Sequence, residues 1–98
     1  MKARHVKQSV TIAREMTIVN ELGLHARPAA EFVRRASGFR SEIWLVKDGK
    51  RFSATSLIDV MRANVDCGTT VTLEATGADA EAAVERLAQV VREFKDEN

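Results

Sequence analysis

The sequence predicts an α+β domain with the element order β-α-β-β-α-β-α, and three observations favour this fold class. The spacing of apolar residues alternates along the chain between the period of two typical of strands and the longer period typical of helices. A central Asp-Gly pair separates two β-prone runs, as in a hairpin. The chain also ends in a long amphipathic stretch. Four such strands would form one antiparallel sheet, covered on one face by the three helices.

The first two predicted elements are a strand and a helix. Residues 16–20 are β-prone, and Gly23 follows them, which predicts a strand that enters a loop. From Ala26 onward apolar residues recur at helical spacing, and Ser37-Gly38 marks the end of this helix. Its apolar positions are Ala29, Phe32, Val33 and Ala36.

A hairpin and a short helix come next. Residues 42–46 and 51–54 are the two β-prone runs, and Asp48-Gly49 lies in the turn between them. A short helix over residues 57–63 is expected to follow, because Ser56 is a suitable N-cap for its first turn.

The last two elements have the clearest patterns. Residues 70–75 alternate with period two, which predicts a half-buried strand. The final helix carries acidic residues in its first turn, where the helix dipole favours negative charge. Its apolar stripe comprises Ala80, Ala83, Val84, Leu87, Val90, Val91 and Phe94.

The chain has 98 residues, a length that predicts a single domain with one core. We place this domain at residues 16–98 and treat residues 1–15 as a basic N-terminal extension that could contribute an extra strand. Residues 10–15 echo residues 16–21 only weakly, so no repeat architecture is indicated.

Composition narrows the classes of function. Fifteen Lys and Arg against fourteen Asp and Glu give a formal net charge of +1, so the overall balance does not indicate a nucleic acid or a membrane as partner. A single cysteine, Cys67, cannot form an internal disulfide, which suits a reducing compartment. No segment has the length of a membrane span. We therefore expect a cytoplasmic protein that needs no metal and no cofactor.

The most informative stretch is residues 23–30, which place His25 at the start of the first predicted helix. Pro28 suits a first helical turn, because the first four N–H groups of a helix have no partner inside it. An imidazole has an ordinary pKa of about 6.5, so much of it is uncharged and nucleophilic near pH 7. A phosphoryl group on His25 would meet the backbone N–H groups of Ala26 and Arg27 and the Arg27 guanidinium. The alternative interpretation of His25 is a helix cap.

Such a site would hold a phosphoryl group rather than generate one. A helix terminus contributes about 0.3–1 kcal/mol and a charge-assisted hydrogen bond roughly 1.5–3 kcal/mol, whereas enzymes lower barriers by about 8–23 kcal/mol. The sequence has no Gly-rich phosphate loop and no obvious magnesium-binding acidic pair. We therefore expect a carrier that is not catalytic alone and takes its phosphoryl group from another protein.

Residues 23–30, Gly-Leu-His-Ala-Arg-Pro-Ala-Ala, resemble the active-site signature of the HPr family, the phosphocarriers of the bacterial phosphoenolpyruvate-dependent phosphotransferase system. The resemblance extends over residues 16–94 and implies the family's open-faced β-sandwich. It also implies that enzyme I phosphorylates His25 on Nδ1, that Arg27 contacts the phosphate, and that an enzyme II component, such as enzyme IIA, accepts the group for sugar uptake.

Ser56 matches the family's regulatory position, which an ATP-dependent HPr kinase/phosphorylase modifies in many members. The sequence Ser56-x-x-Asp59 also resembles a capping box, in which the acid would stand beside the modifiable hydroxyl. We expect Asp59 to weaken phosphorylation of Ser56, because a phosphate there would meet like charge.

A docking face for the partner proteins is expected beside His25. Leu57, Ile58 and Met61 cannot all point inward from one short helix, so at least one of them is exposed, although Leu57 and Met61 are each expected in the core. The resemblance implies that this face comprises Leu24, Ala30, Arg34, Leu57, Ile58 and Met61. A carrier that presents one face to successive partners is expected to be a monomer.

Two other functions stay open. In the first, the phosphohistidine is regulatory and reports phosphoenolpyruvate status to target proteins, as in the nitrogen-related branch of the phosphotransferase system. In the second, a split β-α-β domain binds RNA or a small ligand without phosphorylation. The second fits less well, because no strand interleaves the aromatic and basic residues that base stacking requires.

Overall fold

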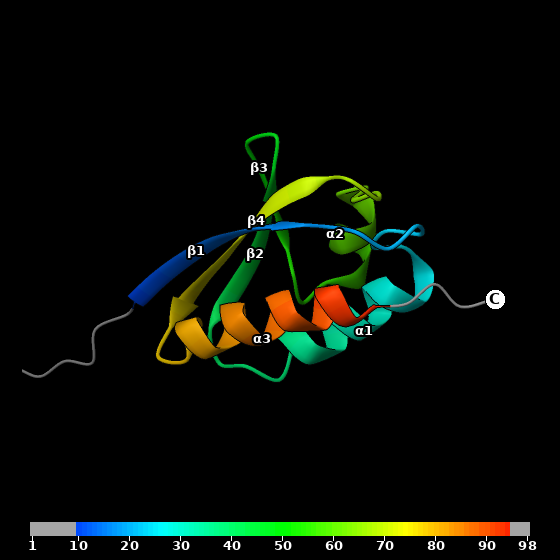
Figure 1. Cartoon of the computed structure of the whole chain (residues 1–98). Helices are drawn as coiled ribbons and strands as arrows, with labels where there is room; N and C mark the ends of the chain where they lie inside the picture. The colour runs from blue at the N-terminus through cyan, green and yellow to red at the C-terminus, as the bar shows by residue number, and fades with distance from the viewer. Residues whose placement is uncertain (1–9, 95–98) are drawn as a thin grey trace, which may run out of the picture.

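The computed structural model describes residues 10–94, and the order of elements matches the predicted one. The four strands form one antiparallel sheet in the order β1-β4-β2-β3. Figure 1 shows α1 and α3 lying together along one side of this sheet, with α2 near the end where α1 begins. The elements are β1 (Val10–Thr17), α1 (Ala26–Ala36), β2 (Glu42–Lys47), β3 (Lys50–Ser53), α2 (Leu57–Arg62), β4 (Thr70–Gly77) and α3 (Ala80–Glu93).

The core lies between the sheet and the helices. Along β4, Val71, Leu73 and Ala75 are buried, while the threonines and Glu74 between them point to the open face. On the neighbouring strand, Leu45 of β2 pairs with Leu73. From the helices, the apolar stripe of α3 and the buried face of α1 close the core. The period-two and helical patterns in the sequence therefore mark the buried faces correctly.

The hairpin between β2 and β3 turns at Asp48 and Gly49, as predicted. Both residues have positive φ angles, 52° and 78°. Two successive residues of this kind form the tight turn whose twist matches that of the paired strands. The hairpin stands away from α1 and α3 (Figure 1).

The position of β1 corrects the sequence-based expectation. The strand expected at residues 16–20 begins at Val10 and ends at Thr17, so residues 10–15 of the expected extension form most of it. Each residue of β1 has a partner on β4, from Val10 opposite Gly77 to Thr17 opposite Thr70. Pairing with this long neighbour, rather than burial, defines the strand, because Met16 is its one buried residue. Residues 1–9 of the extension lie outside the described residues.

An acidic residue joins the start of α3 to the loop before β2. The Asp79 carboxylate accepts hydrogen bonds from the Ser41 hydroxyl at 2.5 Å, from the Ser41 N–H at 2.9 Å and from the Arg40 N–H at 2.9 Å. Asp79 is the N-cap residue of α3, yet its side chain caps no N–H of that helix. The hydrogen bond from the Ser41 side chain, followed by that from the Arg40 backbone, lowers the pKa of Asp79 below its ordinary value of 3.8.

We expect Asp79→Asn to destabilise the fold at pH 7. The side-chain amide would place N–H donors where the Ser41 hydroxyl and the N–H groups of Arg40 and Ser41 need an acceptor. The pKa of Asp79 is lower in the folded state than in the unfolded state, so its stabilisation is present above pH 3.8 and is lost as the pH falls further. Urea unfolding of parent and variant between pH 7 and pH 3 should therefore give free energies of unfolding whose difference becomes smaller as the pH falls below 3.8. The exposed turn residue provides a control, Asp48→Asn. A difference that stays constant across this pH range would contradict the account.

Candidate functional site

His25 lies at the start of α1, where the sequence placed it. It is the N-cap residue of this helix, with an extended backbone at φ −118° and ψ 153°, and its side chain makes no capping hydrogen bond. The imidazole side chain is 40% exposed. The interpretation of His25 as a helix cap is therefore wrong as far as its side chain is concerned, and the ring is accessible for chemistry.

The first turn of α1 leaves backbone donors beside this histidine. The N–H of Ala29 reaches the His25 carbonyl at 3.5 Å, and Pro28 has no N–H. The N–H groups of Ala26 and Arg27 have no hydrogen-bond partner among residues 10–94. Ala26 also has a φ of 45°, a region that residues with a side chain seldom adopt. The turn therefore presents two free donors and the positive end of the helix dipole.

The loop before α1 is held against the segment between α2 and β4. Within the loop, the buried Asn20 side chain donates to the Gly23 carbonyl at 3.0 Å. Across the gap, the Leu24 N–H donates to the Val65 carbonyl at 2.8 Å. Gly23 permits this approach, because it has a φ of 65° and a Cβ atom there would lie 2.4 Å from the Val65 oxygen. The contact brings His25 next to the residue that follows Val65.

That residue is Asp66, which no pattern in the sequence indicates as part of the site. The His25 Nε2 and the Asp66 Oδ1 lie 2.8 Å apart, a hydrogen-bond distance. Both side chains are accessible, with 40% of His25 and 59% of Asp66 exposed. The two residues are 41 positions apart, and nothing in the local sequence around Asp66 indicates a partner for histidine. The structure therefore defines a His–Asp pair at the start of α1.

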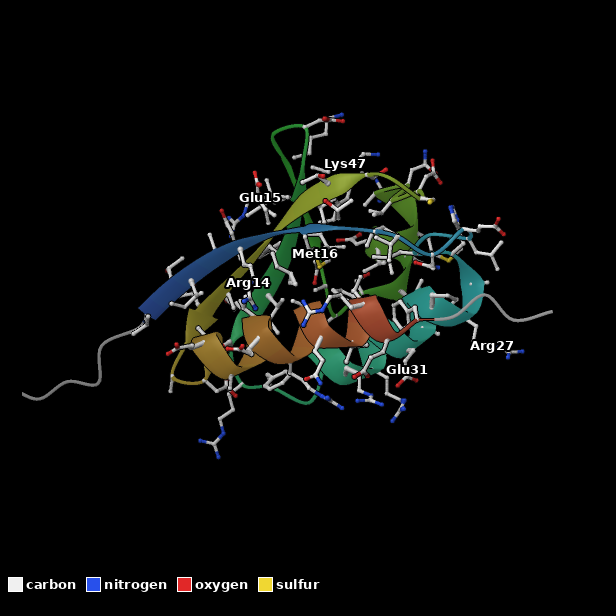
Figure 2. All side chains as sticks on the ribbon, in the orientation of Figure 1. Arg14, Glu15, Met16, Arg27, Glu31 and Lys47 are labelled. Atoms are coloured by element: carbon white, nitrogen blue, oxygen red, sulfur yellow. The ribbon has the colours of Figure 1, made fainter. Side chains whose placement is uncertain are left out.

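Arg27 does not contact the histidine in this structure. Figure 2 shows its side chain extending away from the start of α1. It is exposed and makes no ion pair or hydrogen bond through its side chain within residues 10–94. Its expected contact with a phosphoryl group would therefore require a rotation of the side chain toward His25.

The expected docking face is largely exposed, with one correction. Leu57, Ile58 and Met61 on α2 are 41%, 69% and 43% exposed, so the expectation that Leu57 and Met61 pack in the core is wrong. Val60 is the buried residue of this helix, which is too short to bury a second row. Leu24 is fully buried and therefore cannot contact a partner directly in this conformation.

On α1, Ala30 and Arg34 are both exposed as expected. Arg34 is held by two hydrogen bonds to the Glu31 carboxylate, at 2.9 Å and 2.8 Å. Arg35 binds the same carboxylate from the next position. These arginines lower the pKa of Glu31 below its ordinary value, with the hydrogen bond from Arg34 the larger cause. Arg34 is therefore exposed on α1 and paired with Glu31.

Ser56 caps α2, as the sequence predicts. Its hydroxyl accepts a hydrogen bond from the Asp59 N–H at 3.2 Å. The capping box is not reciprocal, however, because the Asp59 carboxylate accepts from the N–H of Ser53, at 3.2 Å, instead of from that of Ser56. Asp59 thus ties the end of β3 to the first turn of α2.

Among residues 10–94, no group of three or more His, Cys, Asp or Glu side chains is placed to hold a metal ion. In the same part of the chain, no helix is both long and apolar enough to cross a lipid bilayer.

Fold and site together define a class of small α+β proteins: an open-faced sandwich that presents one histidine at the start of its first helix. The family model described as the PTS HPr component phosphorylation site matches residues 12–93. The chain therefore belongs to the HPr family, the phosphocarrier proteins of the phosphotransferase system.

Individual relatives agree with this assignment. The chain is 43% identical over 82 residues to the HPr-like protein Crh of Bacillus subtilis, covering 84% of this chain and 96% of that protein. It is 36% identical over 80 residues to phosphocarrier protein HPr of Cupriavidus necator, covering 82% and 90%. A crystal structure of HPr from Bacillus anthracis superposes with a TM-score of 0.79 at 36% identity, covering 82% of this chain and 95% of that one.

Proposed function

We propose that this protein accepts a phosphoryl group on Nδ1 of His25 from enzyme I and passes it to an enzyme II component such as enzyme IIA. The observation that carries the proposal is the exposed His25 imidazole at the start of α1, which caps no backbone group. Its neighbours supply charge compensation but no chemistry of their own, so the protein acts as a carrier and is not an enzyme alone.

Three groups would stabilise the phosphorylated histidine. The free N–H groups of Ala26 and Arg27 lie in the first turn of α1, where anions are favoured. The Arg27 guanidinium, which is unpaired within the described residues, is available to rotate and bind two phosphoryl oxygens. Each contact is individually modest, which suits a carrier that must release its phosphoryl group again.

The partners would dock on the exposed apolar residues of α2 and the adjacent surface of α1. Ile58 is the most exposed large apolar residue of the described chain, and Leu57 and Met61 flank it. Helices α1 and α2 contact each other, and Ala30 and Arg34 are exposed on α1. Apolar residues exposed next to a reactive group are typical of a binding surface. Leu24 is fully buried and is therefore not part of this surface.

Ser56 is proposed as a second phosphorylation site, for an HPr kinase/phosphorylase. We expect Asp59→Gly to be phosphorylated about twofold to fivefold faster than the parent, because removing this carboxylate relieves repulsion of about 1 kcal/mol or less at a partly exposed site. The initial rate with kinase and ATP measures the effect. Asp59→Asn, which keeps the shape and loses the charge, is the matched control. Equal rates for the parent and both variants would sink this account of Asp59.

Membership of the family leaves two uses of the phosphohistidine to distinguish, sugar uptake and regulation. The similar protein Crh of Bacillus subtilis is described as a catabolite repression HPr, which makes regulation the second candidate. The experiment loads the protein from phosphoenolpyruvate and enzyme I, removes the donor and adds enzyme IIA. Rapid loss of the phosphoryl group to enzyme IIA supports transport, whereas a group that stays on the carrier supports regulation.

A binding function without phosphorylation is the weakest alternative. The aromatic side chain on the open face of the sheet, Trp44, lies under the guanidinium of Arg51, 4.4 Å from the ring centre. Trp44 is thus already stacked, which disfavours base stacking at this position.

The proposed carrier acts as a monomer. HPr from Thermoanaerobacter tengcongensis and Crh from B. subtilis have each been solved as dimers. In this chain a dimer that covered α2 would compete with the proposed partners. Light scattering is expected to give the mass of one chain, and a mass near twice that value would overturn the monomer.

A further inference from the structure

Asp66 pairs with His25 but is not one of the groups proposed to stabilise the phosphoryl group. Asp66 lies in the segment between α2 and β4, and the hydrogen bond from Leu24 to Val65 fixes that segment beside the histidine. The Asp66 carboxylate approaches the Nε2 side of the ring, with 2.8 Å between Nε2 and Oδ1. The other ring nitrogen, Nδ1, has no hydrogen-bond partner among residues 10–94.

An ionised carboxylate only accepts hydrogen bonds. At 2.8 Å from Oδ1, the Nε2 atom of a neutral His25 therefore carries the proton, and Nδ1 keeps its lone pair. A carboxylate that holds one ring nitrogen in this way fixes both the tautomer and the orientation of the imidazole.

We propose that Asp66 is a positioning residue that directs phosphorylation to Nδ1 of His25. This inference rests on the proposed phosphocarrier function and deepens it by naming the group that selects the reacting nitrogen. Asp66 acts through the histidine and does not itself touch the transferred group.

The chemical step needs no proton transfer in this arrangement. The Nδ1 lone pair forms the N–P bond while the bond from phosphorus to the phosphoprotein donor breaks, and the donor atom leaves with that electron pair. The ring then carries a phosphoryl group on Nδ1, a proton on Nε2 and a positive charge, which faces the Asp66 carboxylate. On transfer to an acceptor, the N–P electron pair returns to Nδ1 and the ring is again neutral. The proton stays on Nε2 throughout.

The test combines a spectroscopic signature with a rate. Nitrogen-15 NMR of the unphosphorylated protein at about pH 8.5, where an ordinary imidazole is neutral, reports the tautomer. The parent should show a protonated Nε2 with a slowly exchanging proton and an unprotonated Nδ1. Asp66→Ala should lose the Nε2 proton signal to exchange and shift both nitrogens toward a mixture of tautomers.

The same variants give the rate with enzyme I, magnesium and phosphoenolpyruvate. We expect Asp66→Ala to be phosphorylated about threefold to fivefold more slowly than the parent, as suits a solvent-exposed ion pair. Asp66→Asn should be slowed at least as much, because its amide can donate to Nε2 and so favour the wrong tautomer. Asp48→Asn, which removes one exposed carboxylate from the β2–β3 turn, should match the parent in both measurements.

The outcomes separate this inference from the proposed function. Parent-like nitrogen shifts in Asp66→Ala would overturn the role of Asp66, and so would altered shifts with an unchanged rate. The two measurements can also disagree. If Asp66→Ala changes the tautomer of His25 but the parent takes up no phosphate, the pairing of His25 with Asp66 is supported and the phosphocarrier function is overturned.

Discussion

His25→Ala is expected to take up no phosphate from phosphoenolpyruvate and enzyme I, while the parent takes up acid-labile, base-stable phosphate. The reason is chemical: the variant lacks the nitrogen nucleophile, and the neighbouring groups, Ala26 N–H, Arg27 and Asp66, only stabilise or orient. Incorporation should fall to the background of a reaction without carrier. Radiolabelled phosphate retained on the protein measures the effect.

Two controls make this result specific. His5→Ala removes the second histidine of the sequence and should incorporate phosphate at the parental level. Circular dichroism of His25→Ala should show a fold like that of the parent, since this side chain is half exposed and caps no helix. Phosphate that still enters a folded His25→Ala variant would place the reaction on another residue.

Gly23→Ala is expected to cost about 2–5 kcal/mol of unfolding free energy. The substitution strains a backbone with a φ of 65°, which costs about 1–2 kcal/mol. It also places a Cβ atom 2.4 Å from the Val65 carbonyl oxygen and 2.9 Å from the Asp66 Cα, both of them backbone atoms that must move. That movement weakens the hydrogen bond from Leu24 to Val65, at a further cost of about 1–3 kcal/mol. Urea denaturation measures the loss.

Gly49→Ala is the matched control for Gly23→Ala. Gly49 has a similar φ of 78°, but a Cβ atom there meets nothing within 4 Å. Its loss of stability should therefore be only the backbone cost of about 1–2 kcal/mol. Because Gly23 holds the His25 loop against the Asp66 segment, Gly23→Ala should also weaken the Nε2 proton signal of His25, whereas Gly49→Ala should not. Equal losses for Gly23→Ala and Gly49→Ala would show that the close approach to Val65 has no energetic consequence.

The sequence predicts those features that depend on local chemistry. Helix α1 was expected over the residues it occupies, because apolar spacing, Pro28 and the Ser37-Gly38 pair all act within a few residues of one another. Asp48-Gly49 specified its turn in the same way. His25 was placed at the N-terminus of α1 for that reason too, and the structure confirms this position.

The features that the sequence could not predict depend on pairing across the fold. β1 extends back to Val10 because β4 offers it a partner at every position, and an edge strand with one buried residue has little hydrophobic pattern. Leu57 and Met61 are exposed because α2 buries only Val60 against the rest of the fold, which no pattern in six residues reveals.

Asp66 is the most consequential of these omissions. It approaches His25 only because the loop at Gly23 packs against the segment that follows α2. The tight-turn glycine in the signature stretch was visible in the sequence, but its packing partner was not. The proposed chemistry of the site therefore combines His25 and Arg27, which the motif indicates, with Asp66, which only the structure reveals.

The most direct test of the account is phosphorus-31 and nitrogen-15 NMR of the labelled protein after incubation with phosphoenolpyruvate, magnesium and a bacterial enzyme I. We expect one phosphoryl group per chain, bonded to Nδ1 of His25. No phosphorylation, even with enzyme I from the source organism, or a phosphoryl group on any other atom, would contradict it.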